Sequence, residues 1–350
     1  MISVRSHISI LQALLLLFSV MTTPAAAGAE ETGKEVAVFV TIGQSNADGS
    51  AFADSAEDTR LRQWYESTAN KGKLKIWYRS CKVENQPPNR LGEKPRWVVD
   101  GDTTDAGPGW LDLWYRNENS SGRTAMNMIH GFGTSSTGAD KAQGRRGMEG
   151  ELGMQFALTM PECELYIIKL GVSGSHISSW ADSIDDHNWR YFMQHIYKPA
   201  IDSLTASGAQ PRLAGVWWMQ GCADSDKTRE YYESHLRYLI ERFRRESGFA
   251  DAHFYIGQIV GPGENTDIPD GSKGYSKSVR AAQEAVAADM ADVTMVDTST
   301  FPMQYEKSFG GYIHFNHKGV NTIGRALARL ITQCAGQWAH YDTTEAATTQ

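Results

Sequence analysis

Val36-Ala-Val-Phe-Val-Thr-Ile42, followed directly by Gly43-Gln-Ser-Asn-Ala-Asp-Gly49, is the stretch that decides the fold of this chain. Its first seven residues form a short apolar run, which is typical of a strand buried on both faces of a parallel sheet. The next seven are bounded by glycines and contain small polar side chains, which predicts a tight strand-to-helix turn. We therefore expect Ser45 to lie at the edge of a sheet where its parallel strands end.

Further apolar runs follow along the chain, and amphipathic stretches of helical period lie between them. Strand and helix signals that alternate in this way predict an α/β fold, in which helices cover both faces of a parallel sheet. In such sheets ligands bind at the carboxyl ends of the strands. The predicted strands are 36–42, 74–78, 165–170, 213–219, 254–259 and 293–296, and the predicted helices are 189–206, 228–246, 276–288 and 317–332.

The composition limits the class of protein. The chain has 350 residues, of which 41% are hydrophobic and 10% aromatic, so it can bury a large core and is neither disordered nor fibrous. Its formal net charge of −7 argues against a protein that binds nucleic acid through general electrostatics. The function must therefore come from a specific site.

The ends of the chain and one internal region differ from the rest. Residues 1–27 combine a basic residue, a short apolar run and a closing Ala-Ala-Ala, which indicates a secretory signal peptide. An uncleaved membrane anchor is the alternative, but the run is shorter than the ~20 residues that span a bilayer. We expect one domain over 28–340 with an irregular polar insertion near 49–147, and a frayed tail over 341–350. The mature protein should be secreted or periplasmic, without stable membrane association.

Three loops that follow predicted strands carry the polar residues of interest. Ser45 is a candidate nucleophile in the first loop, or a helix cap. In Gly171-Val-Ser-Gly-Ser-His-Ile-Ser-Ser-Trp180, small residues let backbone N–H groups approach an oxyanion, although such loops are common. In the loop after 213–219, the carboxamide of Gln220 can donate to developing negative charge; the alternative is a buried glutamine that binds loop backbone.

A fourth motif, His314-Phe-Asn-His-Lys-Gly319, precedes the last predicted helix. Because the strand ends converge in space, a histidine in this loop can reach Ser45 as a general base. His314 and His317 do not by themselves predict a metal site, since no carboxylate or third histidine lies at ligand spacing. We expect no metal ion.

Five ordered motifs resemble the SGNH hydrolases, in the branch of sialate O-acetylesterase-like and family-six carbohydrate esterases. That branch has Gly-Gln-Ser-Asn-Met-x-Gly, Gly-Pro-Glu-Leu-Gly, a Lys-x-x-x-Gly-Gly-Thr-Ser-Leu loop that ends in Trp, Trp-x-Gln-Gly-Glu-x-Asp, and a histidine before the terminal helix. The order is the same here, and the motifs span about 36–332. The similar segments are 43–49, 150–153, 169–180, 218–224 and His314.

The resemblance implies a three-layer α/β/α sandwich of flavodoxin-like form that hydrolyses ester groups, usually acetyl, on sugars. Ser45 would be the nucleophile and His314 the base, and such a mechanism needs no cofactor. The resemblance also implies an oxyanion site and a substrate-binding site. The candidates for these are the Ser45 N–H, Gly174, Gln220, Gln44, Asn46 and Glu151.

Two positions depart from the family pattern. Relatives commonly have an aspartate three residues before the histidine, whereas this chain has Gly311. The acid that orients His314 could be Asp297, which we favour, or Glu306, or a backbone carbonyl could take its place. Cys222 stands where relatives often have glutamate, and it could be structural or paired with Cys81, Cys163 or Cys334.

The sequence thus predicts an exported serine esterase that removes O-acetyl groups from a carbohydrate, either an acetylated polysaccharide or a sialic acid-like sugar. The expected partner is that substrate, and nucleic acid is not expected. The alternative is a carbohydrate-binding protein on the same fold that has lost turnover, which Gly311 and Cys222 would explain. The presence of both Ser45 and His314 favours the enzyme over the binding protein.

Overall fold

A computed structural model describes residues 33–52, 55–67, 69–70, 72–77, 109–113, 145–172, 174–260, 275–306 and 311–342. Contacts divide the chain into two units, Met1–Gly33 and Lys34–Gln350, and every helix and strand that the structure describes belongs to the second unit. The predicted signal peptide, most of the predicted insertion near 49–147 and Cys81 lie outside the described residues.

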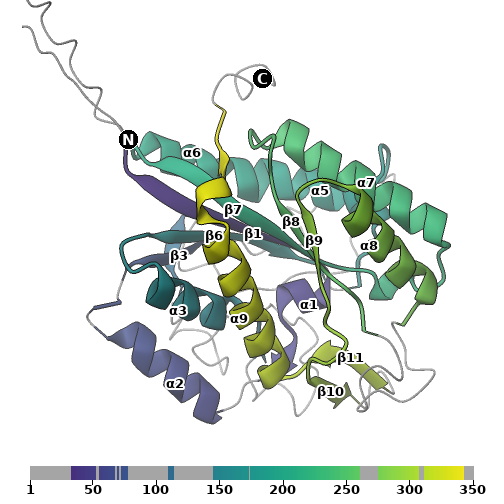
Figure 1. Ribbon diagram of the computed structural model, residues 1–350, viewed down its shortest axis with the longest axis horizontal. Helices are drawn as coiled ribbons and strands as arrows, with labels where there is room; N and C mark the ends of the chain where they lie inside the picture. The colour runs from purple at the N-terminus through teal and green to yellow at the C-terminus, as the bar shows by residue number, and fades with distance from the viewer. Residues whose placement is uncertain are drawn as a thin grey trace, which may run out of the picture. The chain divides into compact units, whose positions relative to one another are not determined.

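The second unit is built on an eight-stranded sheet with the order β4-β3-β6-β1-β7-β8-β9, in which β12 also pairs with β7 (Figure 1). The six strands from β3 to β9 are parallel, while β4 and β12 are antiparallel to their neighbours. The strands are β1 (Glu35–Gly43), β3 (Leu74–Trp77), β4 (Trp110–Asp112), β6 (Leu165–Gly171), β7 (Gln210–Met219), β8 (Phe254–Gly257), β9 (Val293–Val296) and β12 (Ala339–His340).

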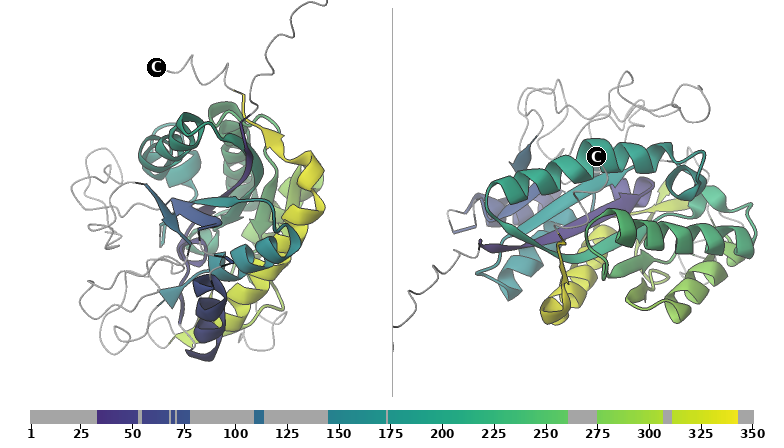
Figure 2. Two further views of the ribbon diagram at one scale, coloured as in Figure 1. Left: turned by 90° about the vertical axis from the view of Figure 1, so that its left-hand side faces the viewer. Right: turned by 90° about the horizontal axis from the view of Figure 1, so that it is seen from above.

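Helices cover both faces of this sheet, so the predicted three-layer α/β/α fold is confirmed (Figures 1 and 2). Helices α3 and α9 pack against each other on one face, and α6 and α7 lie on the other, where α8 packs beside α7. Between α5 and α6 the chain forms one π-helical turn, η3. The helices are α2 (Ser55–Glu66), α3 (Glu149–Thr159), α4 (Ser178–Ala181), α5 (His187–Phe192), η3 (Met193–Tyr197), α6 (Lys198–Ala206), α7 (Arg229–Glu246), α8 (Lys277–Asp289) and α9 (His317–Gln333).

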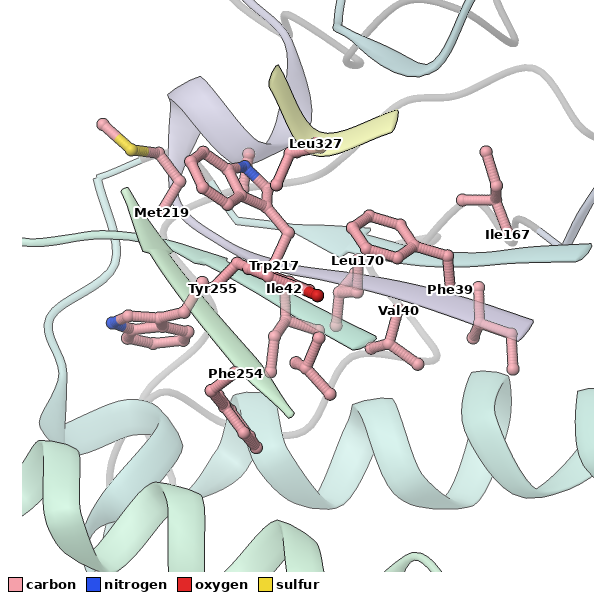
Figure 3. Close-up of a cluster of buried hydrophobic side chains, with 14 of the residues drawn as sticks. Phe39, Val40, Ile42, Ile167, Leu170, Trp217, Met219, Phe254, Tyr255 and Leu327 are labelled. Atoms are coloured by element: carbon pink, nitrogen blue, oxygen red, sulfur yellow. The ribbon is translucent and has the colours of Figure 1, made fainter. Parts of the chain in front are cut away.

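The core lies on both faces of the central strand β1, as its continuous apolar sequence requires. Phe39 points toward the face covered by α9, whereas Val40 and Ile42 point toward the opposite helices (Figure 3). All three side chains are fully buried. Each contributes about 1.5–3 kcal/mol relative to an exposed side chain, which fixes the strand that leads into Ser45.

The chain order of the strands reverses at β1, which lies between β6 and β7. At such a switch point the loops that leave neighbouring strands diverge, and they leave room for a ligand at the carboxyl edge. Gly43, the last residue of β1, pairs with Gly171 of β6 and with Met219 of β7. Ser45 therefore lies just beyond the end of β1, at the edge of the sheet where a binding site is expected.

A two-stranded hairpin was not predicted. Strands β10 (Met303–Glu306) and β11 (Gly311–Phe315) pair as an antiparallel sheet of their own. His314, which we expected in a loop, lies in β11. Directly after it, Asn316 caps α9 by accepting hydrogen bonds from the N–H groups of Lys318 and Gly319 at 2.9 and 3.0 Å. This cap fixes where the strand ends and the helix begins.

The regions expected to be irregular contain some regular structure. Within 49–147 the structure describes α2 and the strand pairs β3–β4 and β2 (Ala51–Phe52) with β5 (Arg145–Arg146). At the start of the tail, Tyr341 packs against Phe249, and Asp342 donates a backbone hydrogen bond to Gly248. Among the described residues, no helix is both long and apolar enough to cross a membrane.

Candidate active site

The turn that carries Ser45 is held between the two strands that flank β1. The N–H of Val172 donates to the carbonyl of Gly43 at 2.9 Å, and the N–H of Gln44 donates to the carbonyl of Met219 at 3.0 Å. Gly43 has φ +141°, and a Cβ atom there would lie 2.3 Å from the Met219 carbonyl oxygen, so the turn requires glycine. Ser45 then starts the short helix α1 (Ser45–Asp48).

Ser45, His314 and Glu306 form a continuous hydrogen-bonded chain. The Ser45 Oγ lies 2.8 Å from His314 Nε2, and the other ring nitrogen, Nδ1, is in direct contact with Glu306 Oε2. The three residues are 6%, 7% and 8% exposed, respectively. In this order a hydroxyl, an imidazole and a carboxylate can activate the oxygen as a nucleophile, take up its proton and stabilise the resulting imidazolium.

An irregularity in the hairpin brings Glu306 to His314. In the pairing of β10 with β11, Gln304 lies opposite His314, but Tyr305 lies opposite Tyr312, so Ile313 is the extra residue of a bulge. A bulge changes the direction in which nearby side chains point. Its position here lets the buried side chain of Glu306 reach back to His314.

The acid that orients His314 is therefore Glu306 and not Asp297, the residue that we favoured. Asp297 lies just beyond β9, where its Oδ1 accepts a hydrogen bond from the Ser299 N–H at 2.8 Å. Hydrogen bonds from Ser299, first from its side chain and then from its N–H, lower the pKa of Asp297 and keep its carboxylate in a local turn. Gly311 leaves no gap in the chain of hydrogen bonds, because the acid comes from the opposite strand of the hairpin.

Asn46 binds the backbone on both sides of His314. Its Nδ2 donates to the carbonyl of Ile313 at 3.0 Å, and its Oδ1 accepts from the N–H of Phe315 at 3.3 Å. The carboxamide thus holds the segment of β11 that carries the imidazole. Substrate or oxyanion binding by Asn46 stays a prediction, and the contacts that the structure shows for its side chain are made with the protein.

A second amide ties the hairpin to the turn with Ser45. Gln304 Nε2 donates to the carbonyl of Ser50 at 2.9 Å, and Ser50 Oγ donates to the carbonyl of Ser45 at 3.1 Å. Gln304 was not among the predicted site residues. The alternation of apolar and polar residues in Met303-Gln-Tyr-Glu306, with two glycines before Tyr312, is a hairpin signal that could have found it.

Gln220 does not serve as an oxyanion donor, because its carboxamide is fully used inside the protein. Its Nε2 donates to the Ser175 carbonyl at 2.9 Å and to Asp224 Oδ2 at 2.5 Å, and its Oε1 accepts from the Tyr232 hydroxyl at 2.9 Å. The side chain has no exposed surface. The alternative prediction, a buried glutamine that binds loop backbone, is correct.

Two other predicted binding residues make contacts within the protein. Gln44 Oε1 accepts from the N–H groups of Gly221 and Ala223 at 3.0 and 3.3 Å, which joins the loop after β1 to the loop after β7. Glu151 lies in α3 and forms ion pairs with Arg60 of α2 and Arg325 of α9. Glu151 therefore ties three helices together and is not part of a substrate site.

Gly174 lies in an exposed turn of the loop after β6, with φ +70°. This left-handed conformation favours glycine and leaves the turn without a side chain. The loop begins beside the Ser45 turn, because Val172 is bonded to Gly43. The role of Gly174 as an oxyanion donor stays a prediction.

The three cysteines that the structure describes give no sign of catalytic chemistry. Cys163, Cys222 and Cys334 are free thiols. Burial raises the pKa of Cys222 to about 12, so its thiol is protonated at neutral pH and is a poor nucleophile. Within the described part of the chain, no cluster of His, Cys, Asp and Glu side chains is suited to hold a metal ion.

Comparisons with known proteins bear on the fold and the family of the chain. Two solved structures share the fold at low sequence identity: a protein from Arabidopsis thaliana (13% identity, TM-score 0.53, 85% of this chain and 98% of that chain) and NanS (14%, 0.51, 87% and 99%). At these identities the likeness shows the fold alone. Among curated proteins, no sequence matches the chain significantly.

A family model described as "Carbohydrate esterase, sialic acid-specific acetylesterase" matches residues 135–333, which is more than half of the chain. The matched range contains Glu306 and His314 and begins after Ser45. The resemblance to the sialate O-acetylesterase branch of the SGNH hydrolases is thereby confirmed, as is the prediction of a carbohydrate acetylesterase. The chain belongs to the family of carbohydrate esterases described as sialic acid-specific acetylesterases.

Proposed function

We propose that this esterase is an exported enzyme that removes O-acetyl groups from a carbohydrate through an acetyl-enzyme intermediate on Ser45. The observation that carries the proposal is the contact of 2.8 Å between Ser45 Oγ and His314 Nε2, with Glu306 on the opposite ring nitrogen. A binding protein would not need a hydroxyl, an imidazole and a carboxylate in this order. The oriented triad therefore supports turnover over the alternative of a binding protein without activity.

In the first half-reaction Ser45 Oγ attacks the carbonyl carbon of the acetyl ester, and His314 Nε2 takes the hydroxyl proton. The carbonyl oxygen becomes an oxyanion, which the N–H groups of Ser45 and Gly174 stabilise. When the C–O bond to the sugar breaks, His314 returns the proton to the departing sugar oxygen. The free sugar hydroxyl leaves, and the acetyl group stays on Ser45.

In the second half-reaction water attacks the acetyl-enzyme, and His314 removes a proton from the water. Collapse of the tetrahedral intermediate breaks the bond to Ser45, which recovers its proton from His314, and acetate is released. Glu306 stabilises the imidazolium in both steps and fixes which ring nitrogen faces Ser45. The chain's own side chains supply the nucleophile, the acid and the base.

Ser45→Ala tests the mechanism. The wild-type protein is expected to release acetate from O-acetylated sugars and from p-nitrophenyl acetate, and the variant to lose more than about 10⁴-fold in rate. An organophosphonate should label Ser45 in the wild type, as peptide mass spectrometry would detect. Ser225→Ala, at an exposed position in the turn after Asp224, is the control that should retain full activity. Unchanged activity in Ser45→Ala would overturn the proposal.

Export and domain organisation complete the proposal. Residues 1–27 would direct the chain out of the cytoplasm and be removed, which leaves a single esterase domain over 28–340. Expression of the full chain in a bacterial host, followed by N-terminal sequencing of the protein from the periplasm or medium, is expected to find Gly28 at the N-terminus. A cell-associated protein that still starts at Met1 would contradict export.

A further inference from the structure

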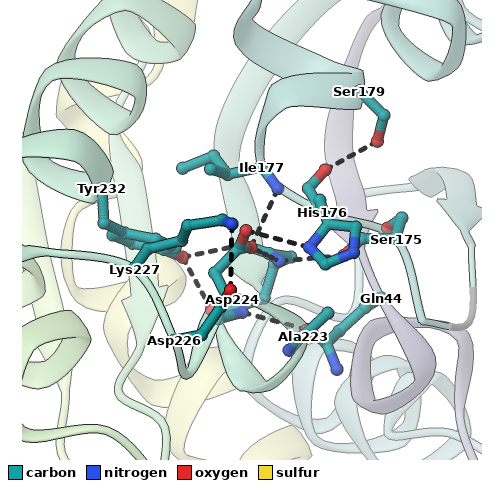
Figure 4. A network of polar contacts seen from close by, with 12 residues as sticks. Gln44, Ser175, His176, Ile177, Ser179, Ala223, Asp224, Asp226, Lys227 and Tyr232 are labelled. Carbon is teal, nitrogen blue, oxygen red and sulfur yellow. Dashed lines mark hydrogen bonds and ion pairs between the residues drawn. The ribbon is translucent and has the colours of Figure 1, made fainter. Parts of the chain in front are cut away.

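A second histidine–carboxylate pair lies near the same edge of the sheet, and the proposed mechanism does not use it. The loop that follows β6 contains His176, and its Nδ1 lies 3.2 Å from Asp224 Oδ1 in the loop that follows β7 (Figure 4). The side chain of Asp224 is completely buried, whereas the His176 side chain is 50% exposed. The carboxylate thus anchors an imidazole that faces solvent.

Within 175–177, His176 is the residue whose side chain faces outward. The carbonyl of Ser175 accepts from Gln220, and the N–H of Ile177 donates to Asp224 Oδ2 at 2.9 Å. The side chains on either side of His176 are buried, at 7% and 0% exposure. The backbone is therefore fixed before and after the histidine, and its side chain projects from a rigid support.

Asp224 holds the loop through Oδ2 and holds the imidazole through Oδ1. Oδ2 receives the hydrogen bonds from Ile177 and Gln220, which hold the loop. The contact of Oδ1 with His176 instead sets the direction of the ring. Because an ionised carboxylate only accepts hydrogen bonds, Nδ1 is the donor, and Nε2 points away from Asp224.

The loop that carries His176 is tied to the turn that carries Ser45. The loop starts at Val172, which is bonded to Gly43, and includes Gly174, the proposed oxyanion donor two residues before His176. It is also joined through Gln220 and Asp224 to the loop that Gln44 binds. Figure 4 shows Gln44, Ser175 and His176 grouped around Ala223 and Asp224.

We propose that His176 contacts the sugar part of the substrate, where its Nε2 hydrogen-bonds an acceptor oxygen and thereby sets substrate preference. The inference rests on the proposed function, because it assigns the sugar side of the same site. An acceptor oxygen can belong to a carboxylate or to a hydroxyl group. A protonated imidazole would bind a carboxylate more strongly, since charge-assisted hydrogen bonds are about twice as strong as neutral ones.

The charges around His176 favour the protonated imidazole, in which Nε2 carries a proton and can donate a hydrogen bond. The hydrogen bond to Asp224 raises the pKa of His176, Asp226 adds in the same direction, and burial and Lys227 act against them. Lys227 is itself paired with Asp226 at 3.0 Å. Because the pKa is raised, Nε2 should keep its proton to a higher pH than an ordinary histidine does, and lose it as the pH rises further.

The test compares a substrate that has a sugar with one that has none. In His176→Ala, KM for an O-acetylated sugar should rise about 10-fold or more, while kcat and the kinetics on p-nitrophenyl acetate stay near wild type. His235→Ala, which removes a histidine on α7 whose ring bonds Tyr231, is the matched control. An equal loss on both substrates would reveal a structural role and overturn the inference, as would no change on either.

A binding experiment separates this inference from the proposed mechanism. In a Ser45→Ala background that cannot turn over, calorimetry would measure the Kd for an O-acetylated sialic acid, which has a carboxylate, and for an O-acetylated xylose oligomer, which has none. Adding His176→Ala should raise the Kd about 10-fold or more. If His176→Ala raises the Kd more for the acidic sugar than for the neutral one, and this difference disappears at high pH, the group that His176 binds is a carboxylate. If the Kd rises equally for both sugars, the group is a hydroxyl. Unchanged Kd values, or no binding of either sugar, would overturn the inference even if the Ser45 mechanism holds.

Discussion

The pairs His314–Glu306 and His176–Asp224 use the same two functional groups in different surroundings. In the first pair both residues are buried, and the second ring nitrogen of the histidine contacts Ser45. In the second pair only the carboxylate is buried, and the histidine is half exposed. The first histidine has a nucleophile within reach, while the second faces solvent.

This difference shows that a histidine–carboxylate pair does not define a catalytic base by itself. Each carboxylate fixes the ring and leaves one nitrogen to act, so the group that meets this nitrogen decides the role. For His314 that group is the Ser45 hydroxyl, which suits proton transfer. For His176 it is whatever enters from solvent, which suits recognition.

The largest effect that would sharpen the comparison is expected from Glu306→Gln. Loss of the carboxylate leaves the imidazolium without its counter-charge and permits the wrong tautomer, so kcat should fall about 10²- to 10⁴-fold on p-nitrophenyl acetate as well as on sugars. Steady-state kinetics on both substrates would measure it. His176→Ala should leave the aryl ester unaffected, so the two pairs separate on this substrate.

Asp297→Asn is the matched control for that variant, because it removes the carboxylate that the sequence favoured. Its only expected consequence is a weaker turn at Ser299, with kcat close to wild type. The assignment of Glu306 fails if Asp297→Asn loses activity and Glu306→Gln does not.

The parts of the site that follow the sheet could be predicted from the sequence. Apolar runs of strand length located β1, β6 and β7, and parallel strands place the loops that leave them at one edge. Ser45 was therefore placed correctly at the end of β1. Local patterns were sufficient here because each of these elements is defined by its own few residues.

The hairpin could not be predicted in the same way. Its strands are short, and they pair only with each other, so no long apolar run marks them. The partner of His314 depends on a bulge at Ile313, which moves Glu306 into reach. A bulge is set by long-range packing and turn geometry, and spacing alone could not choose Glu306 over Asp297.

The protein contacts of the side-chain amides could not be predicted for a related reason. The motif around Ser45 contains Gln44 and Asn46, and the loop after β7 contains Gln220. A carboxamide near a nucleophile can bind substrate or backbone equally well. Whether a carboxamide binds substrate or backbone depends on which backbone groups of other loops need a hydrogen-bond partner. For Asn46 these groups belong to β11, which lies 267 residues away along the chain.

The smallest effect is expected from Asn46→Ala, which tests what holds the base of the buried pair in place. Without the carboxamide, the Ile313 carbonyl and the Phe315 N–H lose their side-chain partner, and the imidazole between them can shift. A misplacement of about 1 Å can cost 10²-fold in rate, so kcat should fall about 10- to 100-fold with KM nearly unchanged. Steady-state kinetics and thermal unfolding together would measure this.

The control variant for Asn46→Ala must remove a similar buried carboxamide that makes no contact with the β10–β11 hairpin. Asn188→Ala fits, because Asn188 Nδ2 bonds Ser179 Oγ at 2.7 Å between α4 and α5. Both variants should lose stability, by roughly 1–3 kcal/mol, but only Asn46→Ala should lose kcat. Asn46→Asp keeps the acceptor for Phe315 and sets an oxygen against the Ile313 carbonyl, so it should not restore the rate. A raised KM with unchanged kcat in Asn46→Ala would instead return Asn46 to substrate binding and leave His314 held by Glu306 alone.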